Sequence, residues 1–233
     1  MRTKVARLGV EIDAVVIKKW VRNLVGGRII QRDVKETWLY LRKDRRLTLA
    51  LLRFTFIALV LLVIGEIAGP FVVNVLHRPI QELPFILAPA GVGLVLGGLI
   101  MPYITQRLGK SRTIALGSLF SAVGLALIPF SRFILSLVSV STQQILYVIA
   151  AITFFTGIAL EMINIPSQTV MQEEAPEEER ARVFAFQSLF FNAGSIPALL
   201  FVGVTADTIG IETVIYLLAG SILGFNLWAA RYR

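Results

Sequence analysis

The feature that most constrains the fold of this chain is a series of long apolar stretches, in which apolar and polar residues do not alternate. A helix needs roughly 20 apolar residues to cross the hydrocarbon core of a membrane, and several stretches reach that length. Only 16% of the 233 residues are charged, whereas a soluble domain has about 25%. The sequence therefore predicts an all-α integral membrane protein.

Six stretches are long enough to span a membrane, and the charged start of the chain precedes them all. They cover residues 54–76, 85–104, 113–130, 145–171, 183–205 and 213–230. The segment between the third and fourth is apolar enough to extend either neighbour. We expect two parts, a basic cytoplasmic linker (1–46) and a six-helix transmembrane domain (47–233).

The distribution of Lys and Arg predicts the orientation of these spans. Residues 1–46 hold thirteen basic and five acidic residues, a surplus that equals the net charge of the whole chain, +8. With a cytoplasmic N-terminus, 21 of the 23 basic residues lie inside, and only Arg78 and Arg132 lie outside. We expect a multi-pass protein of the plasma membrane (in bacteria, the inner membrane) with both termini in the cytoplasm.

Several classes of chemistry are excluded by the residues that the sequence lacks. It has no cysteine, and its only histidine is His77, so disulfides, thiolate metal sites, histidine clusters and Ser-His-Asp triads cannot form. No Walker-type phosphate loop occurs, so ATP hydrolysis is not expected. The expected protein is not an enzyme and holds no metal or cofactor.

An acidic patch interrupts the apolar pattern between the fourth and fifth spans. Five glutamates fall within residues 173–179, in a loop that the predicted orientation places beside the basic inner surface. There they can pair with the basic loop 107–112 or with the N-terminal arm, and they suit the positive end of the following helix. A merely solvated loop is the alternative, because exposed ion pairs are individually weak.

The loop after the second span resembles a motif of the major facilitator superfamily. The stretch GGLIMPYITQRLGKSR is similar to the degenerate C-terminal copy of that loop motif, in which a glycine-rich helix end leads to an acid, a glycine and basic residues. Arg107, Gly109, Lys110 and Arg112 match it, and Gln106 stands where the acid is usual.

The acidic loop carries a second resemblance to this superfamily. The stretch PSQTVMQEEAPEEERARVFAFQ is similar to the segment P-x-E-x-R-G-R-V, which precedes the eleventh helix of exporters in the macrolide and siderophore branch. The matching residues are Pro176, Glu178, Arg180, Arg182 and Val183. Alanine replaces the usual glycine at position 181.

These resemblances imply the C-terminal half of a twelve-helix transporter, with the six spans forming two three-helix repeats. Substrate then binds between two six-helix halves, so the partner is an N-terminal half or a second copy of this chain. The resemblance implies a secondary active, proton-coupled exporter of amphipathic small molecules such as drugs, macrolides or siderophores. A non-transporting six-helix protein, such as an assembly partner, a regulator or a truncated gene product, is the alternative.

Two acids fall inside predicted spans, where charged groups are costly and by default mark functional pathways. Glu66 lies near the centre of the first span, and Glu161 lies slightly to the inner side of the centre of the fourth. In the resembled fold these spans line the central cavity. Each acid is followed within five residues by a proline, Pro70 or Pro166, which removes a backbone donor and kinks or opens the helix.

Our hypothesis is that Glu66 and Glu161 exchange protons during transport or neutralise a cationic substrate. Loss of hydration favours the neutral form of a carboxyl group, which permits proton exchange near neutral pH. Alternatively, each acid only holds helix packing, in a protonated or hydrogen-bonded form. Glu66 can also reach the outer interface if the helix breaks at Gly69.

Other polar and small residues add weaker signals to these spans. The amides that can line the cavity, or instead bond to a neighbouring helix, are Asn164, Gln168, Gln187 and Asn192. Close helix approach is predicted at two glycine pairs, Gly93 with Gly97 and Gly220 with Gly224.

The basic linker contains the stretch VKETWLYLRKDRR, which can form an amphipathic helix on anionic headgroups. Nucleic acid is the other partner that its charge allows, but continuity with a membrane span favours lipid. The expected partners are therefore the bilayer, a small-molecule substrate and protons, and not nucleic acid.

Overall fold

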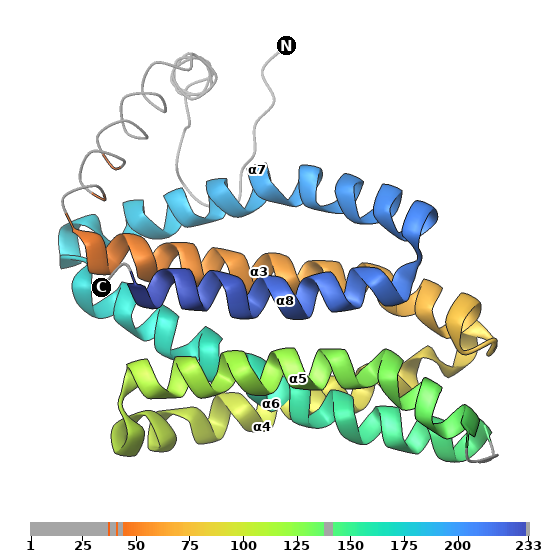
Figure 1. Ribbon diagram of the computed structural model, residues 1–233. Coiled ribbons are helices and arrows are strands. Elements are labelled where there is room, and N and C mark those ends of the chain that lie inside the picture. The colour runs from red at the N-terminus through yellow and green to blue at the C-terminus, as the bar shows by residue number, and fades with distance from the viewer. Residues whose placement is uncertain (1–36, 38–40, 42–43, 138–141, 232–233) are drawn as a thin grey trace, which may run out of the picture. The chain divides into compact units, whose positions relative to one another are not determined.

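The structure, a computed structural model, describes Thr37, Leu41, residues 44–137 and residues 142–231 (Figure 1). The chain divides into two units, Met1–Lys43 and Asp44–Arg233, and the second contains all the helices considered below. The predicted amphipathic helix of the linker lies almost entirely outside the described residues.

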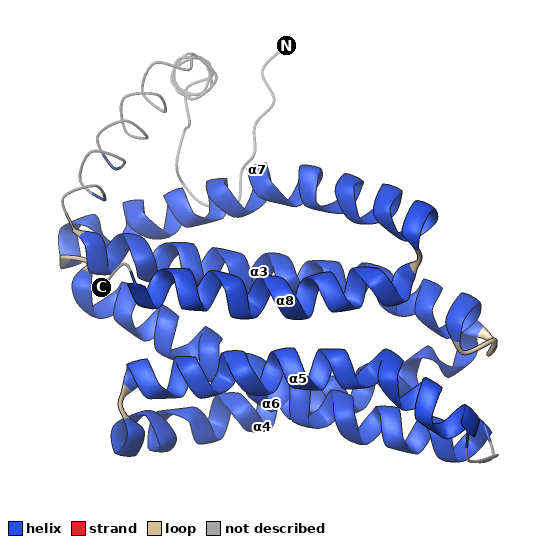
Figure 2. Cartoon of the chain, viewed as in Figure 1, coloured by secondary structure: helices blue, strands red, loops and turns tan. Residues whose placement is uncertain are grey.

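Six long α-helices make up the second unit, and no strand occurs in the described residues (Figure 2). Their bounds are α3 (Arg45–Pro70), α4 (Leu83–Leu108), α5 (Lys110–Leu137), α6 (Thr142–Glu174), α7 (Glu177–Ile209) and α8 (Ile211–Arg231). A π-helical turn, η1 (Phe71–Val75), continues α3, and a 3-10 turn, η2 (Ile80–Glu82), precedes α4. Each long helix is apolar enough to cross a membrane, so the predicted six-span, all-α fold is confirmed.

The helices extend beyond the apolar stretches that revealed them. α3 begins at Arg45, nine residues before the expected start of its span, and the carboxylate of Asp44 caps it by accepting from the backbone N–H groups of Arg46 and Leu47. The segment between the third and fourth spans lengthens both neighbours, because α5 continues to Leu137 and α6 begins at Thr142. Charged and polar residues therefore occupy helix ends that hydropathy alone leaves out.

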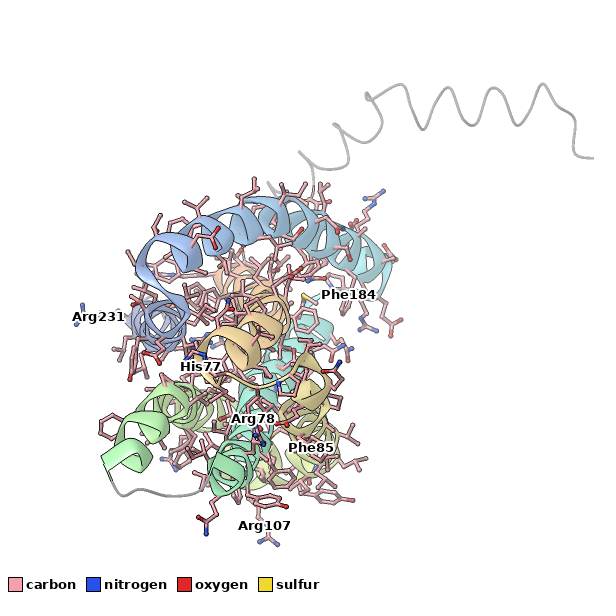
Figure 3. All side chains as sticks on the ribbon, turned by 90° about the vertical axis from the view of Figure 1, so that its right-hand side faces the viewer. His77, Arg78, Phe85, Arg107, Phe184 and Arg231 are labelled. Atoms are coloured by element: carbon pink, nitrogen blue, oxygen red, sulfur yellow. The ribbon has the colours of Figure 1, made fainter. Side chains whose placement is uncertain are left out.

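Successive helices run in opposite directions, so the connections lie at two ends of the bundle. The start of α3, the α4–α5 and α6–α7 connections and the end of α8 share one end (Figure 1). We call this the basic end, because Arg46, Lys110 and Arg231 lie there. Figure 3 views the bundle from the opposite end, where His77 and Arg78 connect η1 to η2.

Two of the connections consist of one glycine with a positive φ angle. Gly109, between α4 and α5, has φ 79° and ψ 149°, and Gly210, between α7 and α8, has φ 90° and ψ 153°. Side chains strongly disfavour this region, whereas glycine enters it freely. The Gly109 N–H donates to the Thr105 carbonyl at 2.9 Å, and its own carbonyl accepts from the Thr113 N–H at 3.1 Å. Each glycine thus ends one helix and starts the next within a single residue.

The helix contacts have an internal symmetry. α6 packs against α4 and α5, whereas α3 packs against α7 and α8. α3 also contacts α6, and α5 contacts α8. Among the first three helices α4 contacts α5, and among the last three α7 contacts α8. Exchanging α3 with α6, α4 with α7 and α5 with α8 reproduces this pattern, which supports two three-helix repeats. α6 packs chiefly against α4 and α5 of the first repeat, whereas α3 packs chiefly against α6 and α7 of the second.

Burial is uneven among the six helices. In the most apolar stretch of each helix, 50% of the residues are buried in α3, α5 and α6, but only 17% in α4 and 11% in α7. α4 and α7 are counterparts in the exchange described above. Most of the surface of both helices is therefore free to contact lipid or another membrane segment.

Glycines bring α4 and α6 into close contact, as the sequence predicted for Gly93 and Gly97. A Cβ atom at Gly93 would lie 2.1 Å from the carbonyl oxygen of Phe154, and one at Gly157 would lie 2.4 Å from the carbonyl oxygen of Ala90. Both distances are shorter than any side chain tolerates, so these positions require glycine at this separation of the helices.

The same prediction is wrong for Gly220 and Gly224 of α8. No atom lies within 4 Å of a Cβ built at either position. The spacing of small residues is the same as in α4, but no described helix covers this face of α8.

The two prolines near the intramembrane acids behave differently. At Pro70 the α-helix gives way to the π-helical turn η1. At Pro166 α6 continues as an α-helix on both sides, and the proline removes only the backbone donor that the Met162 carbonyl would otherwise accept from.

Candidate functional site

Glu161 is a buried acid in the middle of a membrane-spanning helix. It lies on α6 with 8% of its surface exposed, where α6 packs against α4. A Cβ atom at Gly97 of α4 would lie 3.0 Å from the Glu161 Cβ, so the absent side chain at position 97 leaves room for this acid. The Asn164 amide, one turn further along α6, donates to both carboxylate oxygens at 3.2 and 3.1 Å.

Polar residues continue along the same face of α6 toward the basic end. Asn164 and Gln168 are half-buried and follow Glu161 at three and seven residues, a spacing that places all three on one side of the helix. We call Glu161, Asn164 and Gln168 the α6 polar stripe. The structure thus brings three of the five predicted site residues together on one helix.

Glu66 lies in a different environment from Glu161. It is exposed on α3, and no described residue donates a hydrogen bond to its carboxylate. No described atom of another helix lies within 4 Å of a Cβ built on the neighbouring Gly65, so none of the described helices packs closely against α3 at that position. Although α3 and α6 are in contact, no hydrogen bond among the described residues joins the two acids.

The remaining predicted amides lie on α7. Asn192 is exposed, and its amide donates to the Ser188 carbonyl of its own helix at 2.8 Å. Gln187 is buried, with 7% of its surface exposed. Neither residue forms a described hydrogen bond with the α6 polar stripe.

The acidic patch pairs with two basic segments, as the sequence predicted. The Lys110 ammonium, at the start of α5, forms an ion pair with Glu173 near the end of α6. Arg46 of α3 lies 3.9 Å from Glu174. The acids thus link the α4–α5 connection and the start of α3 to the end of α6.

The rest of the patch begins α7. Glu177, Glu178 and Glu179 occupy its first turn, where negative charge is favourable, and Arg182 pairs with Glu179 at 3.1 Å. Pro176 caps the helix, with its carbonyl accepting from the N–H groups of residues 179 and 180 at 3.0 and 2.9 Å. Of the other loop residues singled out, Arg180 is half-buried, and the exposed ones are Gln106, Arg107 and Arg112.

A cavity of about 510 Å³ lies at the basic end, and sequence reasoning did not identify it. Residues of α3, α5 and α6 line it: Arg45, Arg46, Leu49, Ala50, Arg53, Lys110, Ile114, Ser167, Val170 and Glu174. We call it the basic cavity. The spacing of the three arginines along α3 was visible in the sequence, but their convergence with residues more than fifty positions away was not.

The chain thus has six helices long enough to cross a membrane, two three-helix repeats that pack against each other, and an acid in the middle of two of the helices. Few protein families combine these features. A family model of the Major Facilitator Superfamily matches residues 68–232, which is most of the sequence. The chain belongs to the major facilitator superfamily. No match was found among curated proteins or among solved structures.

Membership of the major facilitator superfamily gives the general function. Proteins of this superfamily are transporters rather than enzymes, and they bind small molecules while embedded in a lipid bilayer. This superfamily member is accordingly a multi-pass membrane protein of the transport class. Across residues 44–137 and 142–231, no group of three His, Cys, Asp or Glu side chains has the geometry of a metal site.

Proposed function

We propose that this chain is the C-terminal six-helix half of a proton-coupled exporter of amphipathic small molecules. The observation that carries the proposal is the exposure of Glu66 on a membrane-spanning helix. It lies nine residues before the end of η1, which corresponds to about 14 Å of helix. A carboxylate facing hydrocarbon is costly at that depth, so this face of α3 borders a polar passage.

A second six-helix unit provides the other wall of that passage. The low burial of α4 and α7 supports it, because both helices leave most of their apolar surface available to another membrane segment. Exposed polar groups at Glu66 and Asn192 also require a cover other than lipid. The partner is either an N-terminal half or a second copy of this chain.

Glu66 and Glu161 have different tasks in this proposal. Glu66 faces the passage, where it meets water or a cationic substrate. Glu161 is buried between α6 and α4, where loss of hydration favours its neutral form, while the Asn164 amide stabilises the charged form. Opposing influences of this kind permit a proton to be taken up and released as the helices move.

The substrate class and the orientation come from the sequence. The resemblance of the acidic loop to the macrolide and siderophore exporter branch favours macrolides, siderophores and other amphipathic drugs. The distribution of Lys and Arg favours an orientation in a bacterial inner membrane in which the basic end and both termini face the cytoplasm.

The test measures proton-driven flux of a macrolide and of a cationic dye in inverted vesicles that contain the chain. Glu66→Gln and Glu161→Gln remove one titratable group each, and the expected result is loss of proton-driven accumulation. Glu82→Gln is the matched control, because Glu82 lies in η2, at the end of the bundle opposite the basic end, and pairs there with Arg78. Wild-type flux in both test variants would refute proton coupling through these acids.

The same vesicles test whether the chain transports at all and with which partner. The chain has no cysteine, so one cysteine placed on an exposed position of α7, such as Leu200→Cys, reports crosslinking between copies. Flux together with a crosslinked dimer supports the second-copy arrangement. Absence of flux from the chain alone is also expected if the partner is an N-terminal half, so only absence of flux after co-expression with an N-terminal six-helix half as well would favour the alternative of a non-transporting six-helix protein.

A further inference from the structure

Glycines join the helices of the bundle to different degrees. In α4, α5 and α6 several of them lie so close to a neighbouring helix that a larger residue does not fit. A Cβ atom built at Gly93 of α4 would lie 2.1 Å from the Phe154 carbonyl oxygen of α6. One built at Gly117 of α5 would lie 2.5 Å from the Met162 Cβ of α6. Neither neighbouring atom can rotate away, because a carbonyl oxygen and a Cβ are both fixed to the backbone.

A further glycine and a hydrogen bond strengthen the contacts of α6. A Cβ at Gly124 of α5 would lie 2.2 Å from the Thr156 Oγ1 of α6, which is itself held by donating to the Ile152 carbonyl at 2.7 Å. Thr153 of α6 donates to the Ile86 carbonyl of α4 at 3.1 Å. In a membrane, close packing and hydrogen bonds of this kind are what hold helices together. α6 is thereby joined tightly to both α4 and α5.

The glycines of α7 have a different environment. Gly194 meets only the end of the Leu59 side chain of α3, with the two Cδ atoms 3.2 and 3.7 Å from a Cβ built on it, and Gly203 has no atom within 4 Å. Asn192 and Thr205 donate to carbonyls of α7 itself. The end of a leucine side chain can rotate to follow a moving helix. At its glycines α7 therefore meets an adaptable neighbour or none among the described residues.

The extent of contact follows the same division. α6 and α7 each contain 33 residues, yet the contacts of α6 with α4 and α5 are the most extensive in the bundle, and those of α7 with α3 and α8 are much smaller. The exchange of helices described above makes the α4–α6 and α7–α3 contacts equivalent. The difference between them therefore does not follow from the shared arrangement of the two repeats, but from the residues at each contact.

The connections of α7 restrict the kind of movement that it can make. Gly210 alone joins α7 to α8, and Ala175 and Pro176 join it to α6. Links this short keep both ends of α7 in the bundle. Its movement is therefore a sliding or tilting against α3 and α8, which requires only that side chains at the contact change rotamer.

We propose that α4, α5 and α6 form one rigid body and that α7 moves against the rest of the bundle. Glu161 lies between α4 and α6, so its surroundings stay closed while α7 moves. Asn192 is carried by α7 and changes its position relative to Glu161. The proposal depends on packing alone, and it holds whether or not the proposed function is correct.

Labelling of buried cysteines under native conditions tests the proposal in the purified full-length chain, which has no natural cysteine. Thr113→Cys reports on α5 and Val183→Cys on α7. Both residues have 0% of their surface exposed and lie in the first two turns of their helices. A small water-soluble maleimide reaches such a thiol only when the helix opens. Val183→Cys should react at least about tenfold faster than Thr113→Cys. Equal rates, or a faster reaction of Thr113→Cys, would overturn the proposal.

Glycine variants test whether the rigid body opens separately from α7. Gly117→Ala forces α5 away from α6, so it should speed labelling of Thr113→Cys about tenfold and leave Val183→Cys unchanged. Gly203→Ala is the matched control on α7, because nothing lies within 4 Å of its Cβ, and neither rate should change. Gly124→Ala replaces Gly117→Ala if that variant does not fold, since its nearest contact is a side-chain oxygen. Equal acceleration at both cysteines, or none at Thr113→Cys, would overturn the division into a rigid body and a moving helix.

Discussion

Lys110, the first residue of α5, forms an ion pair with Glu173, the second-last residue of α6. Each charge opposes the dipole of its own helix, since a cation stands at an amino end and an anion at a carboxyl end. The pair offsets both unfavourable positions at once. Its role is therefore to fix the α4–α5 connection against the end of α6, rather than to stabilise either helix alone.

Reversing the charge at position 110 tests this role. Lys110→Glu should lower the midpoint of thermal unfolding in detergent, and adding Glu173→Lys should restore the loss, because the reversed pair also places each charge at the favourable end of its helix. The coupling energy is expected to be below about 1 kcal/mol, because both side chains are partly exposed. A double-mutant cycle measures it, and strictly additive effects of the two changes would contradict a direct interaction.

Adding a methyl group to Gly93 should loosen the packing of α4 on α6. The new Cβ would meet the Phe154 carbonyl, a backbone atom that cannot rotate away, so Gly93→Ala should cost about 1–3 kcal/mol. Gly98→Ala is the matched control on α4, because nothing lies within 4 Å of its Cβ, and it should be neutral or slightly stabilising. Thermal unfolding of both variants decides the comparison, and equal midpoints would contradict close packing at Gly93.

The conformation of Gly109 predicts an unusual pattern of substitutions. Asparagine often replaces glycine in the left-handed helical region, but φ 79° with ψ 149° lies in a region that only glycine enters readily. Gly109→Ala and Gly109→Asn should therefore destabilise the protein to a similar extent, by about 1–3 kcal/mol. Rescue by asparagine relative to alanine, measured by the same unfolding assay, would argue for a different backbone conformation.

The two intramembrane acids should differ in accessibility. In the naturally cysteine-free chain, Glu66→Cys should react with a water-soluble maleimide about tenfold faster than Glu161→Cys, because only the first position is exposed and only a hydrated thiol ionises. Labelling in native membranes makes the measurement. Comparable labelling rates at the two positions would contradict the different environments described for these acids.

The predicted orientation is tested by single cysteines at the two ends of the bundle. Arg78→Cys should be labelled on intact cells by an impermeant reagent, whereas Arg112→Cys should be labelled only after the membrane is permeabilised. The reverse pattern would invert the topology, and the direction of the proposed transport with it.

The number of spans and the partners of the acidic patch could be predicted because both depend on strong local signals. Apolar length determines which segments cross a membrane. Most basic residues on the predicted cytoplasmic side lie near Lys110 or in the N-terminal arm, so the choice of partners for Glu173 was small. The contact of Gly93 with α6 followed from the same small-residue rule that failed at Gly220. That rule says that a helix can approach, but not whether one is present.

The environments of the acids depend on packing that no local pattern encodes. Glu66 and Glu161 both lie in strongly apolar stretches, yet one is exposed and the other is buried. Gly97 of α4 makes room for Glu161, whereas no described helix packs closely at Gly65 beside Glu66. The basic cavity was missed for the same reason. It exists only where α3, α5 and α6 converge, and Arg46, Lys110 and Ser167 are far apart along the chain.

The exchange of partners between the two repeats has a consequence for biosynthesis. Of the six described helices α3 is made first, whereas its main partners, α6 and α7, are the fourth and fifth to be made. The roughly 70 residues between the end of α3 and the start of α6 take roughly 4–14 s to translate. Throughout that interval α3 lacks its main packing partners among the described helices, which leaves it open to wrong association and to quality-control proteases.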